Sequence, residues 1–277
     1  MIKDVMVRLD GTSGDDLRLA AVKLIAEIFD SHITGLLFNV LPPPPIQAEI
    51  NGAGVNQATE PPEAARKAGD AIEAAVFERL TQLHRPTILR RFDVLSDEIS
   101  DTALPLARAA DAFVALRPNG RSNELEGLIE NLLFGTGRHL FLVPDELKAI
   151  APFDHVVVAW NGSRESARAL AEALPYLHRA KKVAVLVVES EHPGEADALK
   201  ANEAVLHLRH HGIDAMKYRA AGEDDEIAEV LIEVCRRLGA NLLVMGSYGH
   251  SRLHELLPGS TTDRILRRSP LPLLIAH

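Results

Sequence analysis

Glycine and hydroxyl residues near the end of the chain have the spacing of an anion-binding loop. The apolar run 242–245 stops at Gly246, Gly249 and Gly259 follow, and Ser260 comes directly after the last glycine. An apolar run that stops at a glycine is typical of a buried strand, and a serine before a helix is typical of an N-cap. Glycines let a ligand approach the backbone, and a helix N-terminus favours negative charge. The stretch therefore predicts a phosphate site.

This loop is neither of the two commonest phosphate loops. The chain has no GxxxxGK[ST] motif and no GxGxxG motif that opens a helix. The spacing Gly-x2-Gly-x9-Gly-Ser after an apolar strand resembles the ATP-binding signature of the universal stress protein family. A tight loop that binds nothing is the alternative interpretation.

The resemblance implies an adenine-nucleotide site in the second half of the chain, with ATP as ligand, with or without Mg²⁺. It implies no catalytic residue and no metal-ligating residue. The binding positions that it implies are Ala159, Asn161, Val188, Met245, Gly246, Gly249, Gly259, Ser260 and Thr261, with His250 as a further phosphate contact.

Asn161 departs from the family pattern, which usually has aspartate there, as the first half has at Asp10. Asparagine can bond a ribose hydroxyl but holds Mg²⁺ poorly, so tight magnesium binding is in doubt. A role of Asn161-Gly162 in turn formation alone is the alternative.

Composition narrows the class of protein. The 277 residues are 47% hydrophobic and only 4% aromatic, with a net charge of −9. Few aromatics and a negative charge argue against a nucleic-acid platform. No run of about 18 apolar residues predicts a membrane span, and the charged N-terminus is unlike a signal peptide. The single cysteine fits a reducing compartment, so we expect a cytoplasmic protein.

Two runs of alternating strands and helices predict two α/β units. Residues 156–163 mirror residues 5–12, which marks the repeat. We expect a domain over 1–145, degenerate in its site, and a second domain over 152–277. The expected strands are 5–9, 33–40, 87–92, 112–116 and 140–143, then 156–160, 183–188, 215–218, 242–246 and 271–275. The expected helices include 17–28, 64–83, 96–109, 123–134, 164–177, 195–210 and 227–238.

The resemblance also implies the architecture. Each unit would be a doubly wound, five-stranded parallel α/β sandwich of the adenine-nucleotide alpha hydrolase-like type, with strand order 3-2-1-4-5. Ligand would sit at the carboxyl ends of its first and fourth strands. The long proline-rich segment 42–62 is either a flap or a surface excursion.

The first half has lost the glycine loop. Arg117 stands where the second half has Gly246, and Gly120 alone matches Gly249. The spacing to Gly127 is short, and Leu128 replaces the hydroxyl residue. We therefore expect Arg117 to intrude on the phosphate position and one nucleotide site per chain. A Gly246→Arg variant should then lose binding and keep its fold.

Other reactive residues favour ordinary roles. His250 and His254 lie four apart, but no further ligand accompanies them, so a surface pair is expected. Cys235 is expected to pack in a helix, and Ser163 lacks the GxSxG motif of a serine hydrolase.

The leading hypothesis is a regulatory, ATP-binding stress protein that is not an enzyme, although slow hydrolysis stays open. No P-loop lysine, general base or arginine finger is visible. The alternative is a protein-interaction module of the same fold that binds no nucleotide, and an ATP-dependent transferase is a weaker third. We expect a protein partner of unknown identity, and an intrachain pseudo-dimer in which 140–143 lies beside 273–276. A homodimer stays open.

Overall fold

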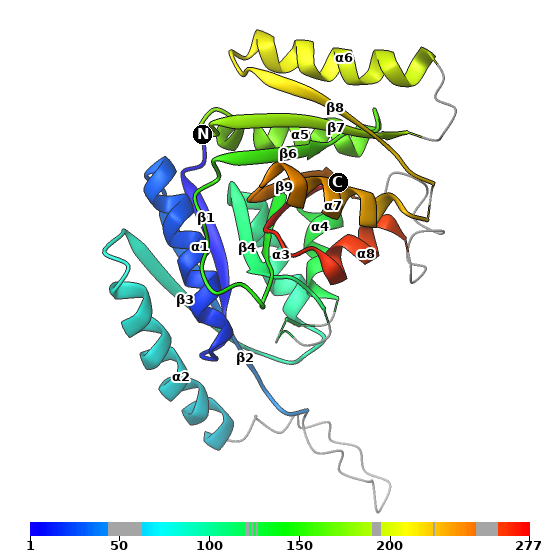
Figure 1. The fold of residues 1–277 in the computed structure, drawn as a ribbon. Coiled ribbons are helices and arrows are strands. Elements are labelled where there is room, and N and C mark those ends of the chain that lie inside the picture. Colours follow the sequence, from blue (N-terminus) through cyan, green and yellow to red (C-terminus); the bar gives the residue numbers. More distant parts are fainter. Residues whose placement is uncertain are drawn as a thin grey trace, which may run out of the picture.

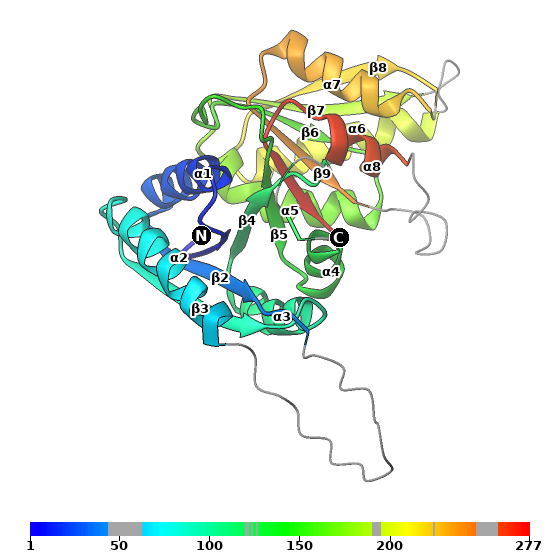
Figure 2. The same ribbon diagram turned by 90° about the horizontal axis from the view of Figure 1, so that it is seen from below.

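The computed structural model describes residues 1–43, 63–119, 122, 124–125, 127–189, 195–223, 225–247 and 260–277, without the side chains of 195–200. Within these ranges the chain forms one continuous sheet of ten strands with helices on both faces (Figures 1 and 2). The strand order is β3-β2-β1-β4-β5-β10-β9-β6-β7-β8. Each half thus has the order 3-2-1-4-5, as the resemblance implied.

The two halves repeat one sequence of elements. The first half contains β1 (Asp4–Leu9), α1 (Gly14–Phe29), β2 (His32–Val40), α2 (Glu63–Thr81), β3 (Thr87–Val94), α3 (Ile99–Ala109), β4 (Ala112–Leu116), α4 (Leu128–Gly135) and β5 (His139–Val143). The second half contains β6 (His155–Ala159), α5 (Arg164–Leu177), β7 (Lys182–Glu189), α6 (Glu195–His210), β8 (Ala215–Ala221), α7 (Ile227–Leu238), β9 (Leu242–Gly246), α8 (Thr261–Arg268) and β10 (Leu273–Ala276).

Alternation along the strands sorts side chains into two cores. Val5, Val7 and Leu9 of β1 pack with α1 and α2, whereas Met6 faces the opposite core with α3 and α4. The helices α5 and α6 share the first core, and α7 and α8 share the second. A parallel sheet buried on both faces has strands that are apolar on both sides, which explains the near-continuous apolar runs in the sequence.

The halves join through their last strands. β5 and β10 pair antiparallel, with Leu142 opposite Leu273 and Leu140 opposite Ile275. The side-by-side arrangement predicted for these two strands is confirmed. The pairing satisfies two apolar strand edges that would otherwise be open to other chains.

The junction also buries an aromatic cluster. The ring of Tyr176 on α5 lies 5.0 Å from Phe29 on α1 and 5.8 Å from Phe153. Phe141 on β5 stacks against Tyr176 as well, at 6.2 Å between ring centroids. The halves therefore share one hydrophobic core across the junction.

Several predicted boundaries were wrong. Helix α3 begins at Ile99, later than the predicted residue 96, and accommodates Pro105 inside it. Helix α4 begins at Leu128, not near residue 123, and β8 runs on to Ala221. The last strand begins at Leu273, later than predicted. The proline-rich segment lies outside the described residues from residue 44 on.

Candidate site at the carboxyl ends of β6 and β9

The sheet reverses its winding between β6 and β9. From β6 the chain crosses to β7 on one side, whereas β9 pairs with β6 on the other, with Val158 opposite Val244. In open α/β sheets such a switch point leaves a crevice at the carboxyl ends of the strands. Ala159 ends β6, and Met245 and Gly246 end β9, so the fold brings these three predicted residues to one edge.

Gly246 is required by the packing of α5 against β9. A Cβ built on Gly246 would lie 2.4 Å from the carbonyl carbon of Glu165 and 2.5 Å from the backbone nitrogen of Ser166. Backbone atoms cannot move aside as a flexible side chain can. We therefore expect Gly246→Arg to disturb the fold, contrary to the expectation from sequence, because the close contact is with the first turn of α5.

Asn161 forms a turn between β6 and α5. Its Oδ1 accepts the backbone N–H of Ser163 at 3.0 Å, and Ser163 in turn caps α5 by accepting the N–H of Ser166 at 3.1 Å. The turn alternative for Asn161 is thus present in the structure. Asn161 is exposed.

Helix α8 begins two residues after Gly259 in the sequence. The hydroxyl of Ser260 accepts the N–H of Asp263 at 3.2 Å, which confirms the predicted N-cap. The first-turn amides of an α-helix have no partner within the helix, and its dipole favours anions there. Thr261 is the first residue of α8 and is half-buried.

The remaining predicted residues fall into two groups. Val188 is near the end of β7, half-buried, and pairs with Ala220 of β8. Gly249, His250 and Gly259 lie outside the described residues, as does His254. The chain enters that segment from Ser247, whose backbone N–H donates to Ala276 at 2.9 Å.

Glu165 is a carboxylate at this edge that sequence reasoning missed. It is buried in the first turn of α5, against Gly246. Burial raises its pKa, but its own backbone N–H, the Ser163 hydroxyl and Arg164 together hold the pKa below the ordinary range. An acidic residue in a first helical turn was a usable signal, but its distance from Gly246 in the sequence hid the contact.

The second half of the chain is similar in sequence to known proteins. Residues 152–277 match the model of the universal stress protein family. Over these residues the chain is similar to universal stress proteins. A universal stress protein of Mycobacterium tuberculosis is 36% identical over 80 residues, which cover 28% of this chain and 27% of that protein, and one from Mycobacterium bovis matches equally. The match thus spans about a quarter of the length of these relatives.

The fold of the whole chain is that of universal stress proteins. The structure of one from Archaeoglobus fulgidus superposes with a TM-score of 0.73 at 13% identity, over 99% of this chain and 95% of that one. A functionally unknown protein from Pseudomonas aeruginosa superposes with a TM-score of 0.60 at 15% identity, over 99% of this chain and 92% of that one. At these identities the likeness concerns the fold alone.

The two halves differ at their carboxyl edges. The strand registers place Ala112 beside Val5 and Leu242 beside Val156, so Leu116 is the counterpart of Gly246. In the first half the glycine is on the helix, because a Cβ on Gly14 would meet the Leu116 side chain at 3.0 Å. In both halves a strand end and a helix start approach closely. A glycine on the strand allows this approach in the second half, and a glycine on the helix allows it in the first.

Arg117 does not intrude on a phosphate position, contrary to the sequence prediction. The strand register makes it the counterpart of Ser247, and it is buried at the junction of the halves. Its Nη1 donates to the Leu266 carbonyl in the last turn of α8 at 3.2 Å, and its Nη2 contacts Glu146 at 2.8 Å. Arg117 therefore connects the first half to the end of α8.

An ion cluster fills the carboxyl edge of the first half. Its members are Arg8, Asp10, Asp15, Arg18 and Glu124, and we call it the first-half ion cluster. Asp10 forms the same turn as Asn161, accepting the N–H of Thr12 at 3.0 Å. Burial raises the pKa of Asp10, but Arg18, Thr12 and Arg8 hold it below the ordinary value.

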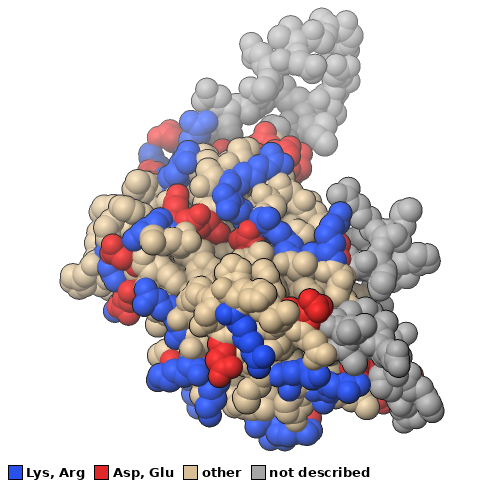
Figure 3. Space-filling view, turned by 90° about the horizontal axis from the view of Figure 1, so that it is seen from above, with Lys and Arg blue, Asp and Glu red and all other residues tan. Residues whose placement is uncertain are grey.

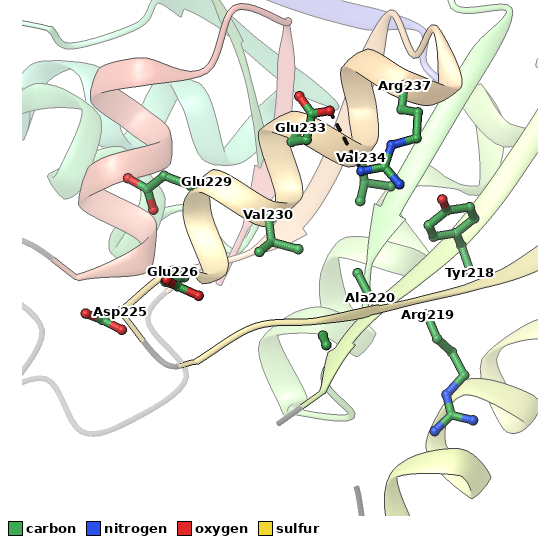
Figure 4. A pocket seen from close by; sticks show the side chains of 11 residues that line it. Tyr218, Arg219, Ala220, Asp225, Glu226, Glu229, Val230, Glu233, Val234 and Arg237 are labelled. Atoms are coloured by element: carbon green, nitrogen blue, oxygen red, sulfur yellow. Dashed lines mark ion pairs between the residues drawn. The ribbon is translucent and has the colours of Figure 1, made fainter. Parts of the chain in front are cut away.

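A groove of about 550 Å³ lies elsewhere, between β8 and α7 (Figure 4). Its acidic side chains include Glu229 and Glu233, which are paired with Arg268 at 3.0 Å and with Arg236 at 2.8 Å. The side chain of Arg219 points away from α7 (Figure 4) and binds Glu189. None of the predicted nucleotide residues that the structure describes lines this groove.

Surface charge and hydropathy agree with the composition. On the face drawn in Figure 3, Lys and Arg side chains are interspersed with Asp and Glu, so no single-sign field covers that face. Over the described ranges, no helix combines the length and apolarity needed to cross a membrane, and no group of three or more His, Cys, Asp or Glu residues could hold a metal ion. Cys235 is buried in α7, and burial raises its pKa to about 12.

Proposed function

We propose that residues 152–277 bind an adenine nucleotide, ATP in particular, and that the chain acts as a regulatory binder in a stress response. The observation that carries the proposal is the switch-point edge between β6 and β9, with Gly246 at the end of β9, together with the Ser260 cap at the start of α8. The intervening sequence has the glycine spacing of the family's ATP-binding signature. A helix start after a glycine loop suits a phosphate group.

The residues present fit such a ligand. Ala159 and Ala169 in the second half stand at the positions that Arg8 and Arg18 occupy in the first, so neither position carries a guanidinium. The Oδ1 of Asn161 is engaged by the Ser163 N–H, and the side chain is neutral. We therefore propose that any Mg²⁺ arrives with the nucleotide phosphates and is not held in advance by the protein.

The protein would bind nucleotide with little or no turnover. Backbone amides that hold phosphate equally in ground and transition states do not lower the chemical barrier. Glu165 is an ionised carboxylate near this edge, but Ser163 and its own amide engage it. We expect ATP hydrolysis no faster than roughly one turnover per minute, below the usual enzyme range. A steady-state assay measures this, and turnover above about one per second would reveal an enzyme.

A single substitution separates the nucleotide proposal from a purely structural role for α8. Glutamate in place of Thr261 should stabilise the helix through its dipole but repel a bound phosphate. In Thr261→Glu we expect ATP affinity to fall by at least about tenfold, with an unchanged or higher melting temperature. Calorimetry on the full chain, with ATP, ADP and AMP in turn, measures affinity and stoichiometry. One site per chain is expected.

The matched control is Gln82→Glu, which adds the same charge at an exposed position after α2. It should leave ATP affinity unchanged, because it is remote from the carboxyl edge of the second half. No heat of binding with any of the three nucleotides would instead favour the interaction module without nucleotide. Equal ATP affinity of Thr261→Glu and wild type would mean that the phosphate does not bind at the start of α8.

A further inference from the structure

The carboxylate of Glu124 is held in the way that a binding site holds an anion. Its side chain is only 2% exposed. Its Oε1 accepts the backbone N–H of Leu116 at 2.7 Å and bonds from Arg18 at 2.6 Å (Nη2) and 2.9 Å (Nε). Its Oε2 lies 3.1 Å from Nη1 of Arg8. A backbone amide and paired guanidinium groups are donors that proteins use for carboxylates and phosphates.

The Glu124 carboxylate lies at the carboxyl ends of two neighbouring strands. It contacts the end of β4, beside β1, and these two strands are the counterparts of β9 and β6 in the second half. Leu116, whose backbone N–H donates to Glu124, is the counterpart of Gly246. The carboxylate is therefore placed in the first half where the second half has the edge that leads into its glycine loop.

The donors belong to the first half alone. The counterparts of Arg8 and Arg18 are Ala159 and Ala169, so the second half has no guanidinium at either position. Glu124 comes from the segment between β4 and α4, whereas the arginines come from β1 and α1. Three separate pieces of chain thus meet at one carboxylate.

The other carboxylates of the cluster cannot replace Glu124. Asp10 and Asp15 both contact Nη1 of Arg18, at 3.2 and 2.8 Å. Glu124 takes the opposite side of the same guanidinium, at Nε and Nη2. Without Glu124 these two donors and the Leu116 amide would remain buried without an acceptor, which is costly.

We propose that the first half contains an oxyanion site, suited to a carboxylate or phosphate group, and that the side chain of Glu124 is its built-in ligand. The site is closed because the chain supplies its own anion. This explains why a half with two buried arginines at its carboxyl edge would take up no external nucleotide. Only the contrast with an open second-half site rests on the proposed function.

Acetate tests the proposal, because Glu124→Ala removes a group of the size and charge of acetate. We expect the melting temperature of Glu124→Ala to fall by about 10 °C, as for the loss of one partner from a buried ion pair. Sodium acetate or formate should then raise it in a saturable manner, relative to sodium chloride at equal ionic strength. Wild type should show no such anion-specific gain.

Two further variants make the test specific. Glu124→Gln keeps the volume but loses the charge, so it should be destabilised and should not respond to acetate. Glu78→Ala removes an exposed glutamate from α2 and should behave as wild type. If Glu124→Ala is unfolded in chloride, recovery of native circular dichroism on refolding in acetate supports the proposal.

The proposal is overturned if acetate raises the melting temperature of all four proteins alike, or if Glu124→Ala melts as wild type does. Failure of Glu124→Ala to refold in acetate as well as in chloride would also overturn it. All measurements are made without nucleotide, so they hold whether or not the second half binds ATP. A failure of nucleotide binding in calorimetry would bear on the proposed function alone.

Discussion

A glycine at the end of β9 is fixed by the backbone of a neighbouring helix. The position a Cβ of Gly246 would take is within 2.7 Å of three backbone atoms of α5. At Gly135 the only close obstacle is the Leu104 side chain, which can change rotamer. Two glycines of similar appearance in the sequence therefore differ in what a methyl group would meet.

We predict that Gly246→Ala lowers the free energy of unfolding by about 1–3 kcal/mol, as overpacking does. The matched control, Gly135→Ala, should cost much less, because Leu104 can yield and alanine suits the end of a helix better. Urea unfolding of both variants measures the difference. Equal costs would mean that α5 is free to shift from β9.

At the scale of elements, Arg117 ties the end of α8 to the first half. Its guanidinium donates to the carbonyl of Leu266 and pairs with Glu146. The carbonyls at a helix C-terminus lack partners within the helix, and a cation there also suits the helix dipole. Since α8 begins at the proposed phosphate site, this contact supports the helix from its opposite end.

We predict that Arg117→Met lowers the free energy of unfolding by about 1–3 kcal/mol, because it leaves a buried carbonyl without its donor. Arg108→Met is the matched control. Arg108 also donates to a carbonyl, that of Gly135 at 2.8 Å, but it is exposed, so water can replace it. Its loss should cost less than about 0.5 kcal/mol. Denaturant titration of both variants checks the ranking, and a reversed order would contradict it.

At the scale of the whole molecule, a chain of polar contacts crosses the junction of the halves. His139 on β5 is fully buried, with Nδ1 at 3.0 Å from Glu172 and Nε2 at 3.1 Å from the hydroxyl of Tyr176. Glu172 also pairs with Arg168 at 2.6 Å. Burial raises the pKa of Glu172, but His139 and Arg168 hold it below the ordinary value.

This depressed pKa has a consequence for acid stability. A carboxyl whose pKa is lowered on folding stabilises the protein above its unfolded value of about 4.3, and that contribution is lost as the pH falls below it. We predict that Glu172→Gln weakens the fall in melting temperature between about pH 5 and pH 3. The exposed Glu78→Gln should leave the wild-type slope. If melting temperature fell with pH equally in all three proteins, Glu172 would not contribute to acid unfolding.

The sequence by itself determined the repeat and the type of most elements, whereas the strand order was implied by the resemblance to a known family. Apolar runs of strand length and the helical stripe of 227–238 are local patterns, and local patterns survive without tertiary information. The predicted pairing of β5 with β10 also followed, since two apolar edge strands in one chain need partners. The N-cap at Ser260 could be predicted from sequence because capping involves residues three apart.

Only the tertiary structure decided what the edges of the two halves do. Glu124 reaches Arg18 across 106 positions, and Gly246 meets Glu165 from the other end of the second half. Arg117 was misplaced by one residue in the sequence comparison, and because strand side chains alternate, one residue moves a side chain to the opposite face. That shift turned an expected obstacle at the phosphate site into a contact between the halves.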